Sequence, residues 1–453
     1  MAQPTVKTQP SERRVKNFSE VSLGFPKKLV FEEARRCPQC VDPVCMKGCP
    51  LGINIPRFIR SLREGNVDSA YAKIKEENCL AAVCGRICSA PCEAACILNE
   101  EGAPPIGIRA LERYAADFGR LKAAKRDQAF LGGKKIAIVG SGPTGLTAAA
   151  QLVQRGYQVT VFESFDKPGG VLRYGIPEFR IPKKTLDNEI NEIRVAGVKI
   201  EVNFLIGHTA SLEELIRQDF DAVLLATGAG IPKFMDLPGA NLGGVYYGEE
   251  FLMRVNRAKS TFFSRKLDKL PVGQRIAVIG SGNTALDCAR IGIRLGREVT
   301  LIFRGIEEDM RVKREERAYA KEEGVRFEPM VRPVEILADP GHFVGGLKCV
   351  RMDYADANGS GEWKITQVPD SEFVIDVDTV VIATGHSPNS LIAKNVSHLK
   401  VNSDGTLRVN EKTGITSMPG VFAAGNVRTN AGPVVEAIAS GKRAAEEIDR
   451  YLK

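Results

Sequence analysis

The chain has 453 residues, too many for one ordinary hydrophobic core, so we expect two or three domains. Hydrophobic residues (43%) and charged residues (26%) occur in the proportions of a soluble globular protein, and the net charge of +8 is modest. The most basic stretches, 13–16 and 311–317, contain no aromatic residues, which argues against a protein that binds nucleic acid.

The sequence also argues against a membrane protein. It contains no run of about 18 apolar residues, the length needed to span a bilayer. The N-terminal stretch MAQPTVKTQPSERRVKNF is polar and lacks the apolar core of a signal peptide. We therefore expect a cytoplasmic protein with no membrane partner and no nucleic-acid partner.

Cysteines dominate the N-terminal region, where nine of the eleven fall between residues 37 and 96. Four lie in the run CPQCVDPVCMKGCP at 37–50, and four more, each four apart, lie in CGRICSAPCEAAC at 84–96. Disulfides, zinc sites and iron–sulfur clusters all use thiols grouped in this way. Disulfides are disfavoured, because a cytosolic chain keeps structural cysteines reduced.

The first run resembles the bacterial ferredoxin run C-x2-C-x2-C-x3-C-P, in which the last cysteine binds the other cluster. By the same logic Cys37, Cys40 and Cys45 hold one [4Fe–4S] cluster here, and Cys49 crosses to a second. Two zinc sites would use the same number of thiolates, but zinc carries no electrons, and two redox-nucleotide folds follow in the chain. We therefore favour clusters. The second cysteine group, which would complete both, consists of Cys84, Cys88, Cys92 and Cys96.

The region around these cysteines is predicted to be helical. Between the two groups, residues 55–78 carry apolar side chains such as Phe58, Ile59 and Leu62 at roughly helical spacing. The stretch LGGKK at 131–135 is the expected linker into the next domain.

An internal repeat follows the linker. Residues 136–160 (IAIVGSGPTGLTAAAQLVQRGYQVT) and 276–300 (IAVIGSGNTALDCARIGIRLGREVT) match at an offset of 140 without a gap. Each copy consists of an apolar strand, a glycine-rich turn, a helix and a second strand. This is the βαβ unit that binds a dinucleotide, and its duplication indicates two dinucleotides.

The first copy carries a complete fingerprint. One glycine makes the turn, the next lets backbone amides approach a pyrophosphate, and the third lets the helix pack on the strand. Glu163 ends the second strand, where a carboxylate accepts hydrogen bonds from ribose hydroxyls. The three glycines are Gly140, Gly142 and Gly145.

The second copy differs at the end of its second strand. Phe303 stands where Glu163 stands in the first copy, and Arg304 follows it. An arginine at this point accommodates the 2′-phosphate of NADP, so the pattern favours NADPH. The fingerprint residues of this copy are Gly280, Gly282 and Asn283.

Together these features resemble the NADPH-dependent glutamate synthase small-subunit family. This family includes the large subunit of electron-bifurcating ferredoxin:NADP oxidoreductases and the N-terminal half of dihydropyrimidine dehydrogenase. The resemblance runs from about residue 12 to the C-terminus. Its most specific parts, besides the cysteine groups, are GGVLRYGIPEFRIPK at 169–183 and VFAAGNVRTNAGPVVEAIASGKRAA at 421–445.

The resemblance implies an α/β fold. A helical N-terminal domain with two [4Fe–4S] clusters would precede two Rossmann-like βαβ nucleotide-binding domains, the second inserted in the first. FAD would bind the first of these and NAD(P)H the second. The expected domains are 1–130 for the iron–sulfur domain, 131–245 and 380–453 for the FAD domain, and 246–379 for the NAD(P)H domain.

The family also implies the ligands of both clusters. Cys96 would join Cys37, Cys40 and Cys45, while Cys49, Cys88 and Cys92 would bind the second cluster. For the fourth ligand of the second cluster, Cys84 and Glu112 are both candidates, because some relatives use a carboxylate or amide there.

The family places FAD contacts in both parts of its split domain. Where relatives usually carry aspartate after Ala-Ala-Gly, this chain has Asn426. Relatives often have a second arginine after the one that matches Arg304, but this chain has Gly305, so NADH is kept as an alternative to NADPH. The FAD contacts would be Gly140, Gly142, Glu163, Gly170, Gly425, Asn426 and Val434.

The implied function is that of an electron-transfer flavoprotein subunit. It would exchange hydride between NAD(P)H and FAD and pass single electrons through the clusters to a partner, for which we favour a glutamate synthase large subunit. The nearest alternative is the large subunit of a bifurcating NADH-dependent ferredoxin:NADP oxidoreductase, or a sulfide dehydrogenase, working with a ferredoxin-reducing flavoprotein subunit. Hydride transfer needs no side-chain acid or base, so no catalytic residue is predicted.

Two other classes are disfavoured. A self-contained disulfide reductase would need a redox CxxC pair beside the nucleotides, but Cys288 stands alone. A flavin-binding subunit without enzymatic activity is disfavoured because both fingerprints are intact. The four histidines show no ligand or triad pattern and are expected at the surface or with ordinary partners: His208, His342, His386 and His398.

Overall fold

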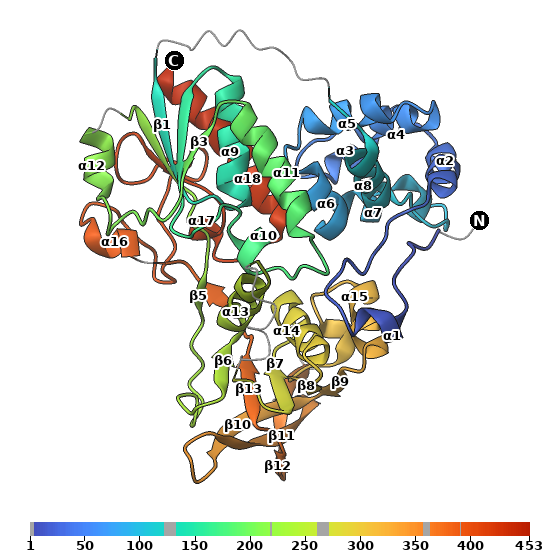
Figure 1. Ribbon diagram of the computed structural model, residues 1–453, viewed down its shortest axis with the longest axis vertical. Coiled ribbons are helices and arrows are strands. Elements are labelled where there is room, and N and C mark those ends of the chain that lie inside the picture. The colour runs from blue at the N-terminus through green and yellow to red at the C-terminus, as the bar shows by residue number, and fades with distance from the viewer. Residues whose placement is uncertain (1–3, 122–132, 218–219, 261–270, 357–362, 390) are drawn as a thin grey trace.

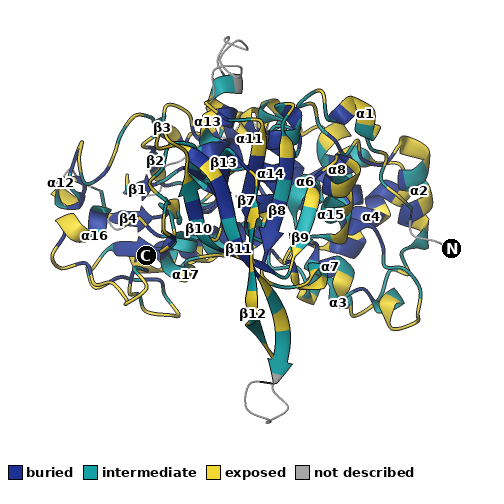
Figure 2. Cartoon of the chain, turned by 90° about the horizontal axis from the view of Figure 1, so that it is seen from below, coloured by how far each residue is buried: buried dark blue, intermediate teal, exposed yellow. Residues whose placement is uncertain are grey.

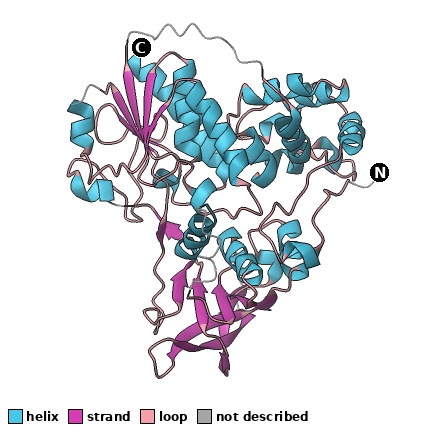
Figure 3. Ribbon diagram, in the orientation of Figure 1, coloured by secondary structure: helices cyan, strands magenta, loops and turns pink. Residues whose placement is uncertain are grey.

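The computed structural model describes residues 4–121, 133–217, 220–260, 271–356, 363–389 and 391–453. Figure 1 shows three parts: an N-terminal helical region, a first nucleotide unit beside it, and a second nucleotide unit below both. The helical region contains helices and no strand among its described residues, whereas each nucleotide unit is built on a sheet (Figure 3).

The helical region spans residues 11–118. Side-chain caps fix where two of its helices begin: Asn54 accepts from the backbone N–H of Arg57 at 3.2 Å, and Asn66 accepts from that of Ser69 at 2.9 Å. Its elements are α1 (Ser11–Arg14), α2 (Lys27–Arg36), α3 (Val44–Lys47), α4 (Ile55–Arg63), α5 (Val67–Lys75), α6 (Ala81–Ile87), α7 (Pro91–Ala94), a 3₁₀ turn (Ile97–Asn99) and α8 (Ile108–Phe118).

The first nucleotide unit contains a five-stranded parallel sheet in the order β15-β4-β1-β2-β3. Its strands are β1 (Lys135–Val139), β2 (Gln158–Phe162), β3 (Lys199–Glu201), β4 (Ala222–Leu225) and β15 (Val421–Ala423). Its helices are α9 (Pro143–Gln154), α10 (Val171–Tyr174), α11 (Lys183–Val195), α12 (Leu212–Arg217), α16 (Leu391–Asn395), α17 (Asn426–Thr429) and α18 (Val434–Leu452).

The second nucleotide unit repeats this plan in a five-stranded parallel sheet of order β6-β13-β7-β8-β9. Its strands are β6 (Val245–Tyr247), β7 (Arg275–Ile279), β8 (Glu298–Phe303), β9 (Arg326–Pro329) and β13 (Thr379–Ile382). Its helices are α13 (Gly248–Ser260), α14 (Asn283–Arg294), a 3₁₀ turn (Glu307–Asp309) and α15 (Arg314–Glu322).

The predicted repeat is present in three dimensions. Strand β1 pairs with β2 so that Ile136 lies opposite Val159, and β7 pairs with β8 so that Ile276 lies opposite Val299, which is the same register 140 residues later. Strand β15 returns to the first sheet after the whole second sheet, so the second unit is inserted in the first. The predicted fold class is confirmed. The exact domain boundaries stay a prediction.

The chain crosses between the two nucleotide units at a small two-stranded ladder. Strands β5 (Ile231–Pro232) and β14 (His386–Ser387) pair antiparallel there, one on the way out of the first unit and one on the way back. This ladder fixes two backbone crossings side by side and thereby places the units relative to each other.

An antiparallel sheet in the second unit was not predicted. It consists of β10 (Val331–Ala338), β11 (Val344–Asp356) and β12 (Trp363–Ile375). Its base packs on the parallel sheet through buried residues such as Leu347 and Cys349, whereas β12 extends away from the body of the protein (Figure 2).

The hydrophobic cores do not follow the three parts. One continuous core joins the helical region to the first nucleotide unit, from Phe25 to Leu452. The second unit has two separate cores, and Phe179 of the first unit inserts into one of them. The helical region and the first unit are therefore one packed body. None of the described helices is both long enough and apolar enough to cross a bilayer.

Candidate functional site

The first fingerprint forms a tight turn between β1 and α9. Gly140 has φ +105°, and a Cβ there would lie 2.5 Å from the carbonyl oxygen of Ala226, which directly follows β4. A Cβ on Gly145 would lie 1.9 Å from the carbonyl oxygen of Gly140. Any side chain at these positions would collide with backbone, so glycine is required. Gly142 directly precedes α9, so the N-terminal end of that helix lies at the site.

Glu163 lies beside this turn at the end of β2. Its buried carboxylate accepts from the backbone N–H of Ser141 at 3.1 Å and of Phe165 at 2.9 Å, and also from the Ser141 hydroxyl. The hydrogen bonds fix an acceptor next to the glycine turn, as a ribose site requires.

The second fingerprint has the same shape. Gly280 has φ +140°, and a Cβ there would lie 2.4 Å from the carbonyl oxygen of Ala383. Gly282 precedes α14, and Asn283 is its first residue. Arg304, directly after β8, is exposed and forms no ion pair with a described residue; the same holds for Arg311. Two free guanidinium groups at this end of the site suit a phosphate.

A single cavity of about 1700 Å³ connects the two fingerprints. Ile87 and Arg109 of the helical region also line it, so all three parts of the protein meet there. Of the twelve predicted nucleotide contacts, Gly145 and Gly425 lie behind the lining, where a Cβ on Gly145 would meet the backbone of Gly140 and one on Gly425 would meet the side chain of Thr144. The cavity brings together the other ten: Gly140, Gly142, Glu163, Gly170, Asn426, Val434, Gly280, Gly282, Asn283 and Arg304.

The stretch 169–183 joins the two nucleotide units. Gly170, with φ +51°, packs against the first turn, where a Cβ would lie 2.8 Å from Cα of Gly142. The buried ring of Phe179 lies 4.0 Å from the guanidinium of Arg294 in the second unit. Arg180 pairs with Asp287 on α14 at 2.8 Å. This segment therefore holds α14 at a fixed place beside the first unit.

Four cysteines line a small, largely apolar cavity in the helical region. Three come from the first run and the fourth, Cys96, comes from the second group, as the resemblance implied. Burial, followed by the neighbouring thiols Cys37, Cys96 and Cys40, raises the pKa of Cys45 to about 11. Such thiols stay protonated at neutral pH, and a metal centre bound among them would favour their thiolate form. This donor set fits an iron–sulfur cluster.

The residues predicted to bind the second cluster gather around Glu112 on α8. Glu112 is buried, accepts from Asn78 Nδ2 at 3.0 Å, and has its pKa raised to about 8 chiefly by burial. The pKa values of Cys49, Cys88 and Cys92 are raised by burial and, in each case, by the charge of Glu112. These three thiols and this carboxylate therefore lie near one another.

Cys84 is fully buried on α6, and its pKa is raised by burial and then by Glu112 and Cys88. All eleven cysteines are free thiols. No three His, Cys, Asp or Glu side chains of the described ranges are arranged to hold a single metal ion.

Polar contacts fix the helical region against both nucleotide units. Glu189 on α11 accepts from the first amides of α6, that of Ala82 at 2.6 Å and that of Val83 at 3.2 Å. Arg109 pairs with Glu315 of the second unit at 2.6 Å. These contacts set the cysteine groups beside the large cavity.

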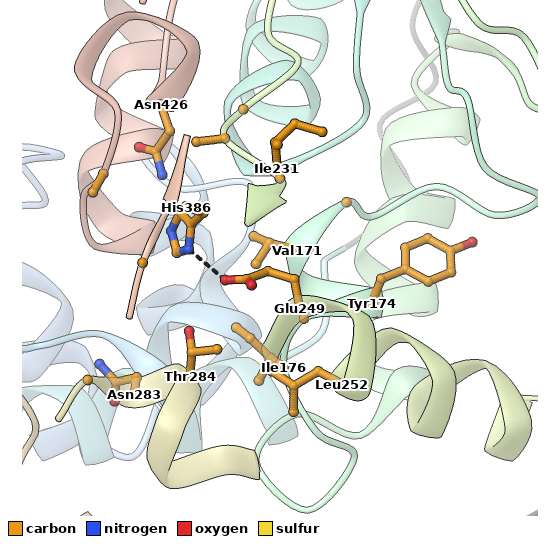
Figure 4. Close-up of a pocket in the computed structure, with 18 of the residues that line it drawn as sticks. Val171, Tyr174, Ile176, Ile231, Glu249, Leu252, Asn283, Thr284, His386 and Asn426 are labelled. Carbon is orange, nitrogen blue, oxygen red and sulfur yellow. Dashed lines mark hydrogen bonds and ion pairs between the residues drawn. The ribbon is translucent and has the colours of Figure 1, made fainter. Parts of the chain in front are cut away.

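Among the cavity residues that sequence reasoning missed are Arg109, Glu249 and His386. His386 Nδ1 lies 2.8 Å from Glu249 Oε1, although 137 residues separate them (Figure 4). The expectation that His386 is an ordinary histidine overlooked its place in the cavity. No local motif marks these residues, because each reaches the site only through the packing of distant elements.

Family models match nearly the whole chain. Residues 134–441 match the pyridine nucleotide-disulphide oxidoreductase family, and residues 14–124 match dihydropyrimidine dehydrogenase domain II, 4Fe-4S cluster.

Three known proteins illustrate the similarity. The chain is 34% identical to the glutamate synthase [NADPH] small chain of Azospirillum brasilense, over 98% of this chain and 94% of the relative. It is 37% identical to the NADP(+)-dependent formate dehydrogenase subunit beta of Moorella thermoacetica, over 91% of this chain but only 60% of that relative. In structure it is similar to FprA of Mycobacterium tuberculosis in complex with NADPH, with a TM-score of 0.55 and 20% identity over 71% of this chain and 85% of that one.

Proposed function

The chain belongs to the pyridine nucleotide-disulphide oxidoreductase family, in the group of the glutamate synthase small chains, and from this premise we propose that it is the electron-input subunit of a larger complex. It is an NAD(P)H-dependent oxidoreductase with FAD and 4Fe–4S cofactors. In our proposal NAD(P)H binds the second unit, FAD binds the first, and electrons leave singly through two clusters to a partner subunit.

One observation carries this proposal. Both fingerprints line the same cavity, and the helical region contributes Ile87 and Arg109 to its wall. Ile87 directly precedes Cys88, so the nucleotide sites lie next to the second cysteine set, by which we mean Cys49, Cys88 and Cys92. When bound, FAD supplies the chemistry that the side chains lack, since it accepts a hydride and gives up electrons one at a time.

The residues of the chain bind and orient the cofactors. Backbone amides at the two glycine turns face the pyrophosphates, Glu163 accepts from a ribose, and Arg304 faces a 2′-phosphate. In the helical region one set of thiolates holds the first cluster: Cys37, Cys40, Cys45 and Cys96.

We propose Glu112 rather than Cys84 as the fourth ligand of the second cluster. Its charge raises the pKa of each of the three thiols predicted to bind that cluster, Cys49, Cys88 and Cys92. Anaerobically purified protein should contain about one FAD and roughly eight irons per chain. Glu112→Ala should lower the iron to roughly four, while Cys84→Ala should leave about eight. The opposite result would assign Cys84, and stoichiometric zinc with little iron would refute both clusters.

For the partner we propose a glutamate synthase large subunit, because the chain spans 94% of the glutamate synthase small chain that it resembles. The second candidate is a subunit of another multisubunit oxidoreductase, such as a bifurcating ferredoxin:NADP oxidoreductase. The similarity to a formate dehydrogenase subunit beta supports this second candidate. Affinity purification from the native host, followed by mass spectrometry, tests the choice: a co-purifying glutamate synthase large subunit supports the first candidate, and a flavoprotein or dehydrogenase subunit supports the second.

A further inference from the structure

A histidine and a glutamate form a pair at the point where the two nucleotide units meet. Glu249 lies in the first turn of α13 in the second unit, and His386 lies on β14, where the chain crosses back to the first. Figure 4 shows the two side chains pointing toward each other inside the cavity. The 2.8 Å contact between Glu249 Oε1 and His386 Nδ1 fixes the orientation of the carboxylate.

The walls around this pair are mostly apolar. Val171 and Ile176 approach from the first unit, Ile231 from the crossing strand β5, and Leu252 from α13 (Figure 4). Val171 is 50% exposed and Ile231 is 38% exposed, and both line the cavity. A flat apolar ring would cover this surface, with the carboxylate of Glu249 in the same wall of the cavity.

One oxygen of the pair has no partner. Glu249 Oε2 is buried, and no hydrogen-bond donor reaches it from any described residue. An unsatisfied buried acceptor is costly, so such an oxygen calls for a donor from a ligand. Because His386 holds Oε1, Oε2 is left as a fixed acceptor without a partner in a residue that lines the cavity.

The chemistry of the pair points to one part of the nucleotide. If the proposed function holds, the nicotinamide must lie between the two fingerprints, because it passes a hydride from the second site to the first. Nicotinamide is a flat ring with a carboxamide NH₂ donor at its edge. We propose that Glu249 accepts a hydrogen bond from this NH₂ group, and that His386 is the positioning residue that holds Glu249.

The proposed hydrogen bond is tested by measuring, by calorimetry, how tightly three ligands bind to the FAD-loaded protein. The first is the preferred oxidised nucleotide, NAD⁺ or NADP⁺. The second is its 3-acetylpyridine analogue, in which a methyl ketone replaces the carboxamide and no NH₂ remains. The third is the matching ADP-ribose or 2′-phospho-ADP-ribose, which lacks the ring entirely.

Glu249→Ala should weaken binding of the carboxamide nucleotide about tenfold, the effect of one charge-assisted hydrogen bond, and leave the other two ligands within about twofold. The matched control is Glu250→Ala, which removes a carboxylate from the same helical turn. Glu250 pairs with Arg254 at 2.6 Å and does not line the cavity. This control should bind all three ligands as the wild type does.

His386 should behave as a positioning residue. His386→Leu should weaken binding of the carboxamide nucleotide, but less than Glu249→Ala does. His386→Gln can still donate a hydrogen bond to the carboxylate, so it should keep most of the wild-type affinity. FAD content and melting temperature should not change in either variant.

The outcomes separate this inference from the proposed function. Equal weakening of all three ligands by Glu249→Ala would show that the pair is only a structural contact, and no weakening of any would show that Oε2 meets another donor; either overturns the inference. If Glu249→Ala loses FAD, the inference is tested on the wild-type protein alone. Equal affinity of the wild type for the carboxamide and acetyl nucleotides would then overturn the inference. A wild-type protein that binds none of the three ligands would instead refute the proposed function.

Discussion

Lys313 of the second nucleotide unit donates a hydrogen bond to the backbone carbonyl oxygen of Cys88, 225 residues earlier in the chain. Cys88 belongs to the second cysteine set, and Lys313 lines the nucleotide cavity. One lysine therefore links the proposed NAD(P)H site to the backbone of a proposed cluster ligand. The neighbouring pair of Arg109 and Glu315 strengthens the same junction.

Lys313→Met should loosen this junction. The variant removes a charge-assisted hydrogen bond, of about 1.5–3 kcal/mol, that no other described donor replaces at this carbonyl. Hydrogen–deuterium exchange of the backbone amides at 84–90 should become roughly tenfold faster. Arg314→Met, at the next and exposed position, is the control and should leave exchange unchanged. Identical exchange in both variants would show that the contact does not stabilise the cysteine loop.

Arg304→Ala should raise the Michaelis constant for NADPH much more than that for NADH. The guanidinium is exposed, lines the cavity and has no ion-pair partner among the described residues, so it is available for a 2′-phosphate. Loss of such a contact is worth about 1.5–3 kcal/mol, or roughly tenfold to a hundredfold. Steady-state kinetics with both nucleotides measure this. Equal effects on both, or a wild-type preference for NADH, would contradict the 2′-phosphate role.

Cys49→Ser should interrupt the route to the partner. Cys49 is encoded in the first cysteine run but lies with Cys88, Cys92 and Glu112, so its loss should remove the second cluster and lower the iron content. FAD should remain, and NADPH should still reduce an artificial dye that reaches the flavin directly, while transfer to the partner is lost. Cys79→Ser is the control, because Cys79 instead donates to Thr147 Oγ1 in the core. Partner-dependent turnover at the wild-type rate in Cys49→Ser would show that electrons take another way.

Glu323→Gln should lower the melting temperature at neutral pH. The buried carboxylate of Glu323 receives hydrogen bonds from Arg14 Nε at 2.9 Å, Arg290 Nη2 at 2.9 Å and Arg294 Nη1 at 2.6 Å. Burial by itself would raise its pKa, but the hydrogen bonds from Arg294 and Arg290 lower it to about 2.

The pH dependence has a definite sign. Because the folded pKa lies below the ordinary value of about 4.5, the stabilisation is fully present above pH 4.5 and is lost as the pH falls toward 2. It is on the order of 3 kcal/mol, because one pKa unit corresponds to about 1.4 kcal/mol. The difference in melting temperature between wild type and Glu323→Gln should therefore shrink over that range. The control is Glu322→Gln, whose side chain is 56% exposed and whose melting temperature should differ little from that of the wild type at any pH. A difference for Glu323→Gln that stays constant with pH would contradict the stabilising role of the Glu323 carboxylate.

The sequence alone determined the two βαβ units, because the constraints that produce them are local. Positions 140 and 280 must be glycine, because a Cβ at either would collide with backbone. The strand before each turn and the helix after it follow from short-range apolar patterns. The 140-residue offset was therefore visible in the letters and reappears as the same strand register. The cysteine runs could also be recognised from the sequence, because the spacing of the cysteines is a local feature of the chain.

Tertiary structure decided everything that depends on residues far apart. Arg14 was part of a basic stretch in the sequence, but it is buried in the second nucleotide unit on Glu323. His386 had no pattern of its own, and it meets Glu249 only because β14 returns beside the first turn of α13. A charge or an imidazole takes its role from its surroundings, and these are assembled by packing between elements hundreds of residues apart, which no local pattern encodes.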